Sequence, residues 1–404
     1  MSLQTALSGL DAAQTGLDTV SNDLANASTT AFKSQAALFE DVYPTGEANV
    51  PGYGATTEGM DTNDSEGSLT STGNGLDAAI QGNGYFVVSD NGAQQYTRDG
   101  AFQLSSNGTL QTASGASAMG YSGTSTSGTL TPITVSTGSM PANPSAKLGV
   151  DLDLNSGDAQ IPATTTFSPT DSTTYSESTS TVAYDSLGNA NTVKLYLVQN
   201  QAAGGATPSW TVYAQPVTST GTAIGGPTNL TTLNFNTNGT LASGSPKTLT
   251  VNWNNGAAGS TLSFDFSGTT LGAQNFAVAG LTNDGYAAGT YNGTSINSAG
   301  QIVSTYSNSQ TVTNGTLALA NFINPEGLEA QSGNIFAATN TSGTAVINTP
   351  GTGQAGTVEG GYLEASNAST SSLLVSLIQY QQAYQANTSV LQTEQQDAQR
   401  LVQI

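Results

Sequence analysis

The sequence of 404 residues contains no cysteine and no histidine. Without them the chain cannot form a disulfide, a zinc site of Cys and His ligands, or a Ser-His-Asp or Cys-His catalytic site. Basic residues are also scarce: the six are scattered singly, so the clustered Lys and Arg that bind nucleic-acid phosphates are missing. We therefore expect no nucleic-acid partner, no cofactor, no metal and no catalytic residues.

The chain also lacks long apolar runs and a basic leader. No apolar run approaches the ~18 residues of a membrane span, and the first basic residue is Lys33. Acidic residues outnumber basic ones 27 to 6, giving a net charge of −21, yet charged residues make up only 8% of the chain. We expect no membrane span, export without a cleaved signal peptide if the chain leaves the cell, and a surface rich in small polar side chains.

The first 31 residues predict an amphipathic helix with a strict heptad repeat. Apolar residues recur every seven positions in two rows, Leu3, Leu10, Leu17, Leu24, Ala31 and Ala6, Ala13, Val20, Ala27. Such rows are typical of helices that pack on other helices. Gly9 and Gly16 weaken a helix that stands alone. The helix could pack on its own domain or on further copies of the chain.

The C-terminal end repeats this pattern. From Ser371 the sequence predicts one helix of about 30 residues, with Leu377, Tyr384, Leu391 and Ala398 spaced by sevens. The two terminal helices can pair, but so narrow a pair needs further copies to bury its apolar rows. The candidate subunit-packing seam consists of Leu3, Leu7, Leu10, Leu17, Val20, Leu24, Leu377, Tyr384, Leu391 and Leu401.

Between the helices the hydrophobic pattern changes to period two. Strands are predicted at 180–184, 192–198, 210–214, 247–253, 261–266 and 301–306. Three Asn-Gly pairs predict tight hairpin turns, at Asn107-Gly108, Asn238-Gly239 and Asn314-Gly315. The predicted fold is mainly β with α-helical termini, in nested β-barrel or β-sandwich domains, with the terminal helices paired as a coiled-coil-like end domain.

Shifts in composition predict a nested domain order. Residues 1–33 and 366–404 would form a terminal helical domain, and 34–72 an extended connector. Residues 73–144 and 273–365 would form a discontinuous β domain, into which 145–272 would be inserted as an outer β domain.

Two acidic groups are candidate sites of weak specificity. Asp151 and Asp153 lie two apart on a predicted strand and so share a face, as a pair of glycosidase carboxylates would. A solvated strand face of an acidic protein is the favoured interpretation. The segment 61–67 has some calcium-loop spacing, but its Gly falls one place late and Thr72 stands where a closing Glu is needed.

The two ends carry a recognisable motif. The stretches Leu17–Asn26 and Thr29–Lys33, with Leu363–Asn367 and Tyr384–Asn387, resemble those of the bacterial flagellar rod and hook proteins. The motif positions are Asn22, Ala25, Asn26, Phe32, Lys33, Glu364, Ser366, Asn367 and Asn387. This sequence has Asp23 where that family usually has Asn, and Ala31 where it usually has Gly.

The middle of the chain separates the branches of that family. Three stretches are more similar to hook members than to rod members, namely 182–189, 233–241 and 320–328. The resemblance implies a non-enzymatic subunit that polymerises into a flexible, curved, hollow tube, a universal joint that transmits torque from rod to filament. A distal rod protein is the alternative, although its middle should be much shorter.

The resemblance also implies partners and a location. Beyond identical copies, they are flagellar rod proteins, a hook cap protein, hook–filament junction proteins and the flagellar export apparatus. The expected location is the extracellular part of the flagellum.

Overall fold

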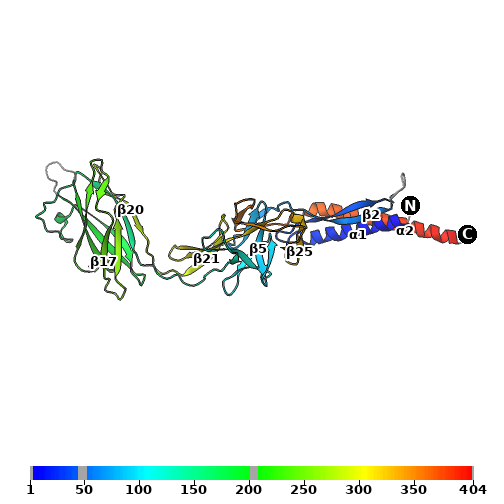
Figure 1. Ribbon diagram of the computed structural model, residues 1–404, viewed down its shortest axis with the longest axis horizontal. Coiled ribbons are helices and arrows are strands. Elements are labelled where there is room, and N and C mark those ends of the chain that lie inside the picture. The colour runs from blue at the N-terminus through cyan, green and yellow to red at the C-terminus, as the bar shows by residue number, and fades with distance from the viewer. Residues whose placement is uncertain (1–2, 44–51, 201–207, 403–404) are drawn as a thin grey trace. The chain divides into compact units, whose positions relative to one another are not determined.

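The computed structural model describes residues 3–43, 52–200 and 208–402, with the side chains of 401 and 402 left out. The chain forms two compact units. Unit 1 comprises Met1–Thr137, Gly293–Thr305 and Thr311–Ile404, and unit 2 comprises Gly138–Asn292 and Tyr306–Gln310. Both are built mainly of strands, and a long helix stands at each end of the chain (Figure 1). The mainly β fold with helical termini is therefore confirmed.

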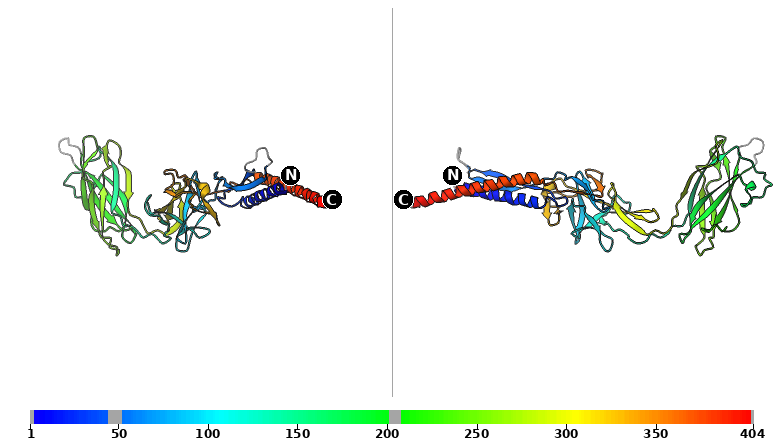
Figure 2. Two further views of the ribbon diagram at one scale, coloured as in Figure 1. Left: turned by 45° about the vertical axis from the view of Figure 1, so that its right-hand side comes forward. Right: turned by 180° about the vertical axis from the view of Figure 1, so that it is seen from behind.

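The terminal helices are α1 (Leu3–Ala25) and α2 (Thr370–Val402), which lie side by side (Figures 1 and 2). No Gly or Pro interrupts α2. The helix predicted over 1–31 was too long, because α1 ends at Ala25. Beyond it, Asn26 donates to the backbone oxygen of Asn22, and Thr29 donates to the side chain of Asn26. Such local side-chain bonds favour turns over continued helix.

A hairpin of β1 (Gln35–Val42) and β2 (Gly54–Thr62) follows α1 and packs on it. The strands run antiparallel, with Gln35 opposite Thr62. This hairpin occupies much of the segment for which we predicted an extended connector. The division of the chain into four domains stays a prediction.

The rest of unit 1 contains one large sheet and two small ones. The central path of the large sheet runs in the order β21 (Tyr291–Ile296), β22 (Gln301–Tyr306), β23 (Thr311–Leu317), β9 (Ser117–Ser122), β5 (Tyr85–Asp90), β6 (Ala93–Thr97), β26 (Ile335–Ala337) and β25 (Glu329–Gln331). Its side members are β7 (Phe102–Leu104), β8 (Leu110–Thr112), β10 (Thr131–Pro132), β24 (Leu319–Asn321) and β27 (Val346–Asn348). The small sheets pair β4 (Ala78–Gln81) with β28 (Thr357–Gly360), and β3 (Leu69–Ser71) with β29 (Tyr362–Glu364). A 3-10 turn, Pro325–Gly327, precedes β25.

Unit 2 contains two five-stranded sheets. One holds β17 (Lys247–Val251), β18 (Ser260–Asp265), β11 (Lys147–Asn155), β19 (Thr270–Gly272) and β20 (Ala277–Asn283). The other runs β12 (Glu177–Tyr184), β13 (Ala190–Gln199), β14 (Trp210–Val217), β15 (Thr228–Phe235) and β16 (Leu241–Ser243). A 3-10 turn, Ser172–Thr174, precedes β12.

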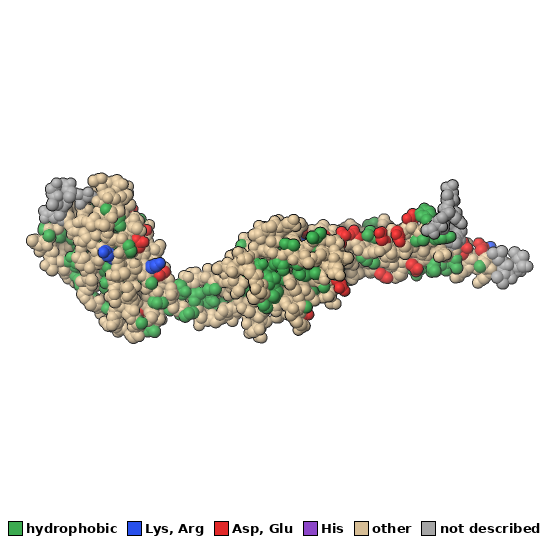
Figure 3. Space-filling view, in the orientation of Figure 1, with side chains coloured by type: hydrophobic (Ala, Val, Ile, Leu, Met, Phe, Trp, Pro, Cys, Tyr) green, Lys and Arg blue, Asp and Glu red, His purple; other side chains and the backbone are tan. Residues whose placement is uncertain are grey.

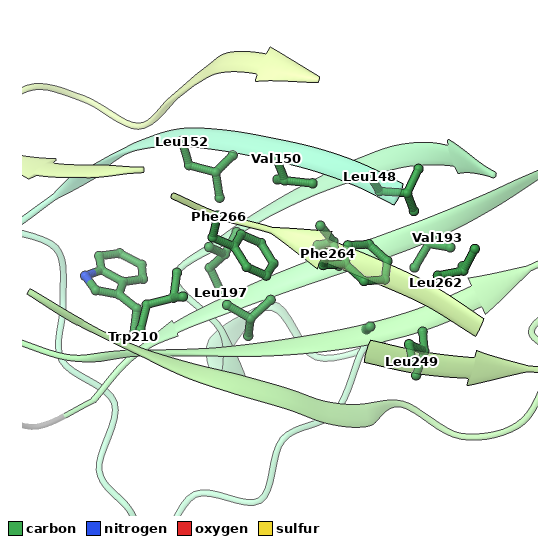
Figure 4. Packing of buried hydrophobic residues seen from close by; sticks show 14 of the residues in the cluster. Leu148, Val150, Leu152, Val193, Leu197, Trp210, Leu249, Leu262, Phe264 and Phe266 are labelled. Atoms are coloured by element: carbon green, nitrogen blue, oxygen red, sulfur yellow. The ribbon is translucent and has the colours of Figure 1, made fainter. Parts of the chain in front are cut away.

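The core of unit 2 lies between these two sheets (Figure 4). Along β11, Leu148, Val150, Leu152 and Leu154 are buried while the residues between them are not. They pack against Trp210 and other buried residues of the second sheet. This alternation is what a strand with one buried face requires. All six strands predicted from the period-two pattern are confirmed.

Two of the three predicted Asn-Gly turns are confirmed. Gly108 and Gly239 have φ of 81° and 82° and connect β7 to β8 and β15 to β16. The third prediction was wrong, because β23 continues through Asn314 and Gly315 with a bulge opposite β22. Gly315 is needed here for close packing, since a Cβ would lie 2.8 Å from the backbone oxygen of Tyr121 on β9.

Candidate functional site

The two terminal helices meet through glycines on α1. A Cβ added at Gly9 would lie 2.8 Å from Nδ2 of Asn387, and one added at Gly16 would overlap the ring of Tyr380. Because 9 pairs with 387 and 16 with 380, the helices run antiparallel and their contacts repeat every seven residues. Glycines that weaken an isolated helix therefore let α1 approach α2 closely.

The helix pair buries only part of its apolar surface. On α1, Ala6, Ala13 and Val20 are buried, whereas Leu10, Leu17 and Leu24 are half-buried and Leu3 and Leu7 are exposed. On α2, Leu377, Tyr384 and Leu391 are half-buried. Leu401 belongs to α2, but its side chain lies outside the described residues. The seam predicted from the sequence thus lies partly inside the protomer and partly on its surface.

At the base of the helices, meaning the C-terminal end of α1 and the N-terminal end of α2, three charged side chains form a buried ion cluster. Glu364 on β29 receives Nζ of Lys33 at 2.7 Å and Nε of Arg98 at 2.8 Å. All three residues are at most 5% exposed. The backbone N–H of Gly67 donates to the same carboxylate at 2.9 Å. One carboxylate therefore ties together the segments after α1, after β2, after β6 and before α2.

The two cations of the ion cluster also donate to backbone carbonyls. Arg98 donates to the backbone oxygens of Ile80, Gly82 and Gly84, and Lys33 donates to that of Ser65. Burial by itself would raise the pKa of Glu364. The attraction of Arg98, together with the hydrogen bonds from Lys33, Gly67 and Arg98, outweighs burial and lowers that pKa. Glu364 is therefore held as a carboxylate between two cations.

Asn367 extends the junction towards α2. Its Nδ2 donates to the backbone oxygens of Asn63 and Ser65, and its Oδ1 accepts from the N–H of Ser34 at 2.8 Å. Its own N–H donates to the backbone oxygen of Phe32 at 3.2 Å. The segment before α2 is thereby bound to the residues that follow β2 and to the segment between α1 and β1.

The other motif residues lie around this junction. Asn22 and Asn26 bond each other at the end of α1, Ala25 is the exposed last residue of that helix, and the side chain of Ser366 accepts from the N–H of Ala368. Asn387 lies 17 residues, or almost five helical turns, beyond the start of α2 at Thr370, opposite Gly9. The motif is thus mostly one structural junction rather than a continuous surface.

Sequence reasoning missed Arg98, Tyr380 and the role of Gly9 and Gly16 as contact positions. A seven-residue spacing joins Gly9 to Gly16, and Tyr380 to Asn387. That shared spacing was the signal that could have identified the contact.

The weak candidate sites have structural partners. Asp151 accepts from the N–H of Gly268, and Asp153 accepts from the hydroxyl of Thr270, so both hold the chain beside β11. In the segment 61–67, the N–H of Gly67 is directed at Glu364. The described residues contain no group of three or more His, Cys, Asp or Glu side chains placed to hold a metal ion.

The part of the chain that the structure describes also contains no helix long and apolar enough to cross a membrane.

Matches between parts of the chain and known protein families first define a class, the axial proteins of the bacterial flagellum. Residues 3–33 match the family described as "Flagella basal body rod protein", and 359–404 match "Flagellar basal body rod FlgEFG protein C-terminal". Residues 79–166 match "Flagellar hook protein FlgE/F/G D1 domain", and 151–286 match "Flagellar basal body protein FlaE D2 domain".

Full-length relatives then give the family. The flagellar hook protein FlgE of Salmonella typhimurium is 36% identical over 415 residues, covering 100% of both chains. That of Brucella abortus is 30% identical over 400 residues, covering 97% of this chain and 95% of the relative. The chain belongs to the flagellar hook protein family, which is structural and not enzymatic.

A solved structure is similar in fold. The flagellar hook protein FlgE2 of Helicobacter pylori superposes with a TM-score of 0.56 over 72% of this chain and 99% of that chain, at 14% sequence identity.

Proposed function

We propose that this hook subunit polymerises with identical copies into a flexible, curved, hollow tube. The tube acts as a universal joint that transmits torque from the rod to the filament. The terminal helices would pack against those of neighbouring copies, and the β units would stack around them. The seam residues Leu3, Leu7, Leu10 and Leu17 would supply contacts between copies.

The observation that carries this proposal is the apolar surface left open on the helix pair. Leu3 and Leu7 are 54% and 50% exposed on α1, and Val375 and Ile378 are 56% and 52% exposed on α2. Leu3 and Leu7 are about one helical turn apart, as are Val375 and Ile378, so each helix presents an exposed apolar pair of the kind found at interaction surfaces. Because both helices carry such residues, identical copies can cover one another.

Further partners follow from the place of a hook between rod and filament. We propose contacts with flagellar rod proteins at one end, and with the hook cap and hook–filament junction proteins at the other. The chain would leave the cell unfolded through the flagellar export apparatus. A chain without cysteine cannot be trapped by disulfides on that route.

Electron microscopy of the purified protein tests the proposal. Short curved tubes are expected, whereas straight rods would favour the distal rod alternative. Leu17→Asp should abolish the tubes, because a charge buried without a partner costs several kcal/mol in each subunit. Far-ultraviolet circular dichroism should still report a folded monomer, since Leu17 is only half-buried in the protomer.

Leu187→Asp is the matched control. Leu187 is 60% exposed in unit 2, far in sequence from either terminal helix. Tubes from this variant should resemble those of the wild type. If Leu17→Asp also assembles normally, the terminal helices do not form the packing seam.

A further inference from the structure

A cavity in unit 1 lies between α1, the start of β1 and the first turns of α2. Its volume is about 390 Å³, and its walls include Val20 and Asp23 from α1, with Leu373 and Tyr380 from α2. Exposed Ala36 and Ser369 stand at its mouth. Solvent or another molecule can therefore reach the cavity.

Asp23 gives the cavity an unsatisfied acceptor. The residue is 1% exposed, and its Oδ2 accepts from the backbone N–H of Gln35 at 3.0 Å. Its Oδ1 is buried and has no hydrogen-bond partner among the described residues. Burial raises the pKa of Asp23, against the smaller effect of the Gln35 hydrogen bond. A carboxylate in this position is stabilised by any donor that reaches Oδ1, most of all a cationic one.

The charges around the cavity favour a cation. The exposed carboxylate of Asp61 also lines the cavity, and no Lys or Arg does so among the residues described. The acidic side chains on the hairpin and terminal helices are visible in Figure 3. A neutral or cationic group would therefore enter more readily than an anion.

The chain offers few cations for this role. Lys33 and Arg98 already pair with Glu364 in the ion cluster, and Lys147, Lys194 and Lys247 lie in unit 2. Among the described residues of unit 1, Arg400 remains, near the end of α2. Its side chain is 77% exposed, and among the described residues it has a loose contact with Asp397 at 3.7 Å.

Arg400 cannot reach the cavity of its own chain. The cavity wall on α2 includes Tyr380, and the 20 residues from there to Arg400 span about 30 Å of helix at 1.5 Å per residue. A second copy, shifted along the helix axis by about that length, would bring its own Arg400 to the cavity mouth.

We propose that this cavity is a docking site for Arg400 of a second copy of the chain, whose guanidinium donates to the free Oδ1 of Asp23. The proposal rests on the proposed polymer and specifies one contact within it. Arg suits the site because its planar group presents several donors and is more weakly hydrated than an ammonium. The contact would fix the axial offset between neighbouring copies.

A double-mutant cycle on assembly tests the contact. Asp23→Asn retains an oxygen for the N–H of Gln35 but places an NH₂ where the free Oδ1 lies, so it faces a donor with a donor. Arg400→Gln removes the guanidinium. Each single variant should raise the critical concentration for polymerisation about tenfold, as expected for a hydrogen bond to a charged group. The double variant should show no further rise, because the two changes remove one interaction.

Two control variants isolate the contact from general charge effects. Asp11→Asn removes an exposed carboxylate from the same helix, and Lys194→Gln removes an exposed cation from unit 2. Both should leave the critical concentration within twofold of wild type. Circular dichroism of each monomer checks that the fold is intact.

Three results would overturn the proposal. The single variants could assemble like wild type, or their effects could multiply in the double variant. Alternatively, Asp23→Asn alone could act and the effect could depend on whether sodium or potassium is present, which would indicate a small bound cation instead. Failure of the wild type to polymerise would contradict the proposed function itself, and so is a distinguishable outcome.

Discussion

Replacing Glu364 by Gln tests whether the ion cluster holds the base of the terminal helices. Glutamine keeps the size of the side chain and one acceptor oxygen, but it removes the negative charge between Lys33 and Arg98. In the variant, the glutamine NH₂ must face at least one of the donors Lys33, Arg98 and Gly67, each of which bonds a carboxylate oxygen in the wild type. The change therefore leaves two buried cations without a counter-ion.

The size of the effect follows from the remaining contacts. Removing one partner of a buried ion pair costs roughly 3–5 kcal/mol. Arg98 keeps its hydrogen bonds to three backbone carbonyls, and Lys33 keeps its hydrogen bond to the backbone oxygen of Ser65. We therefore expect a loss of stability at the lower end of this range, about 3 kcal/mol. At about 2–4 °C per kcal/mol for a unit of this size, the melting temperature of unit 1 should fall by roughly 6–12 °C.

The distribution of chromophores allows each unit to be followed separately. Both tryptophans, Trp210 and Trp253, lie in unit 2, and both terminal helices lie in unit 1. Urea unfolding by far-ultraviolet circular dichroism should show a destabilised helical transition, while the tryptophan fluorescence transition stays where it is in wild type. Glu329→Gln, an exposed strand residue, is the control and should change neither transition. A helical transition that moves by less than about 0.5 kcal/mol would refute the reasoning.

Four further expectations follow from the structure. Because the folded-state pKa of Glu364 is lowered, its contribution to stability is present above the unfolded pKa of about 4.5 and is lost as the pH falls below that value. The free energy of unfolding of unit 1, measured against pH, should show this loss in wild type but not in Glu364→Gln. Gly16→Ala should weaken tube assembly in sedimentation assays, because its Cβ meets the ring of Tyr380, and Tyr380→Ala should relieve the clash. Ala31→Gly should raise the free energy of unfolding of unit 1 by about 0.5–1 kcal/mol in urea titration, because Ala31 has φ of 56°, a backbone conformation that glycine adopts without strain. Polymer yield should rise as salt increases from 0.01 to 0.2 M, since each subunit carries a net charge of −21 and salt screens the repulsion between subunits. A yield that falls with salt would mean that ion pairs between subunits dominate.

The periodic parts of the fold were predictable because local pattern determines them. The alternation along β11 and β13 indicates a buried face wherever such strands pack, and the long stretch without Gly or Pro predicts α2. The error at Asn314-Gly315 has a different origin. Asn-Gly favours a turn locally, but here the approach of β9 requires a residue without a side chain.

The ion cluster could not be predicted, because its members are far apart in the sequence. Lys33 and Glu364 are separated by 331 positions, and Arg98 and Glu364 by 266. No spacing rule connects such residues, and single basic residues in an acidic chain usually remain solvated. The resemblance to rod and hook proteins singled out Lys33 and Glu364 as motif positions, but only the fold gives them a shared physical role.

The junction and the seam differ in how completely each is satisfied within one chain. At the junction, Glu364 and Asn367 have their partners in the protomer, so the base of the helix pair is fixed before any assembly. Along the helix pair, the seam residues Leu3 and Leu7 remain exposed, as does Ile378 next to the seam residue Leu377, and Asp23 keeps one acceptor unused. A subunit that arrives with its helix base already held loses less conformational entropy when neighbours cover the helices. The affinity between copies then depends on the open apolar faces and not on building the junction.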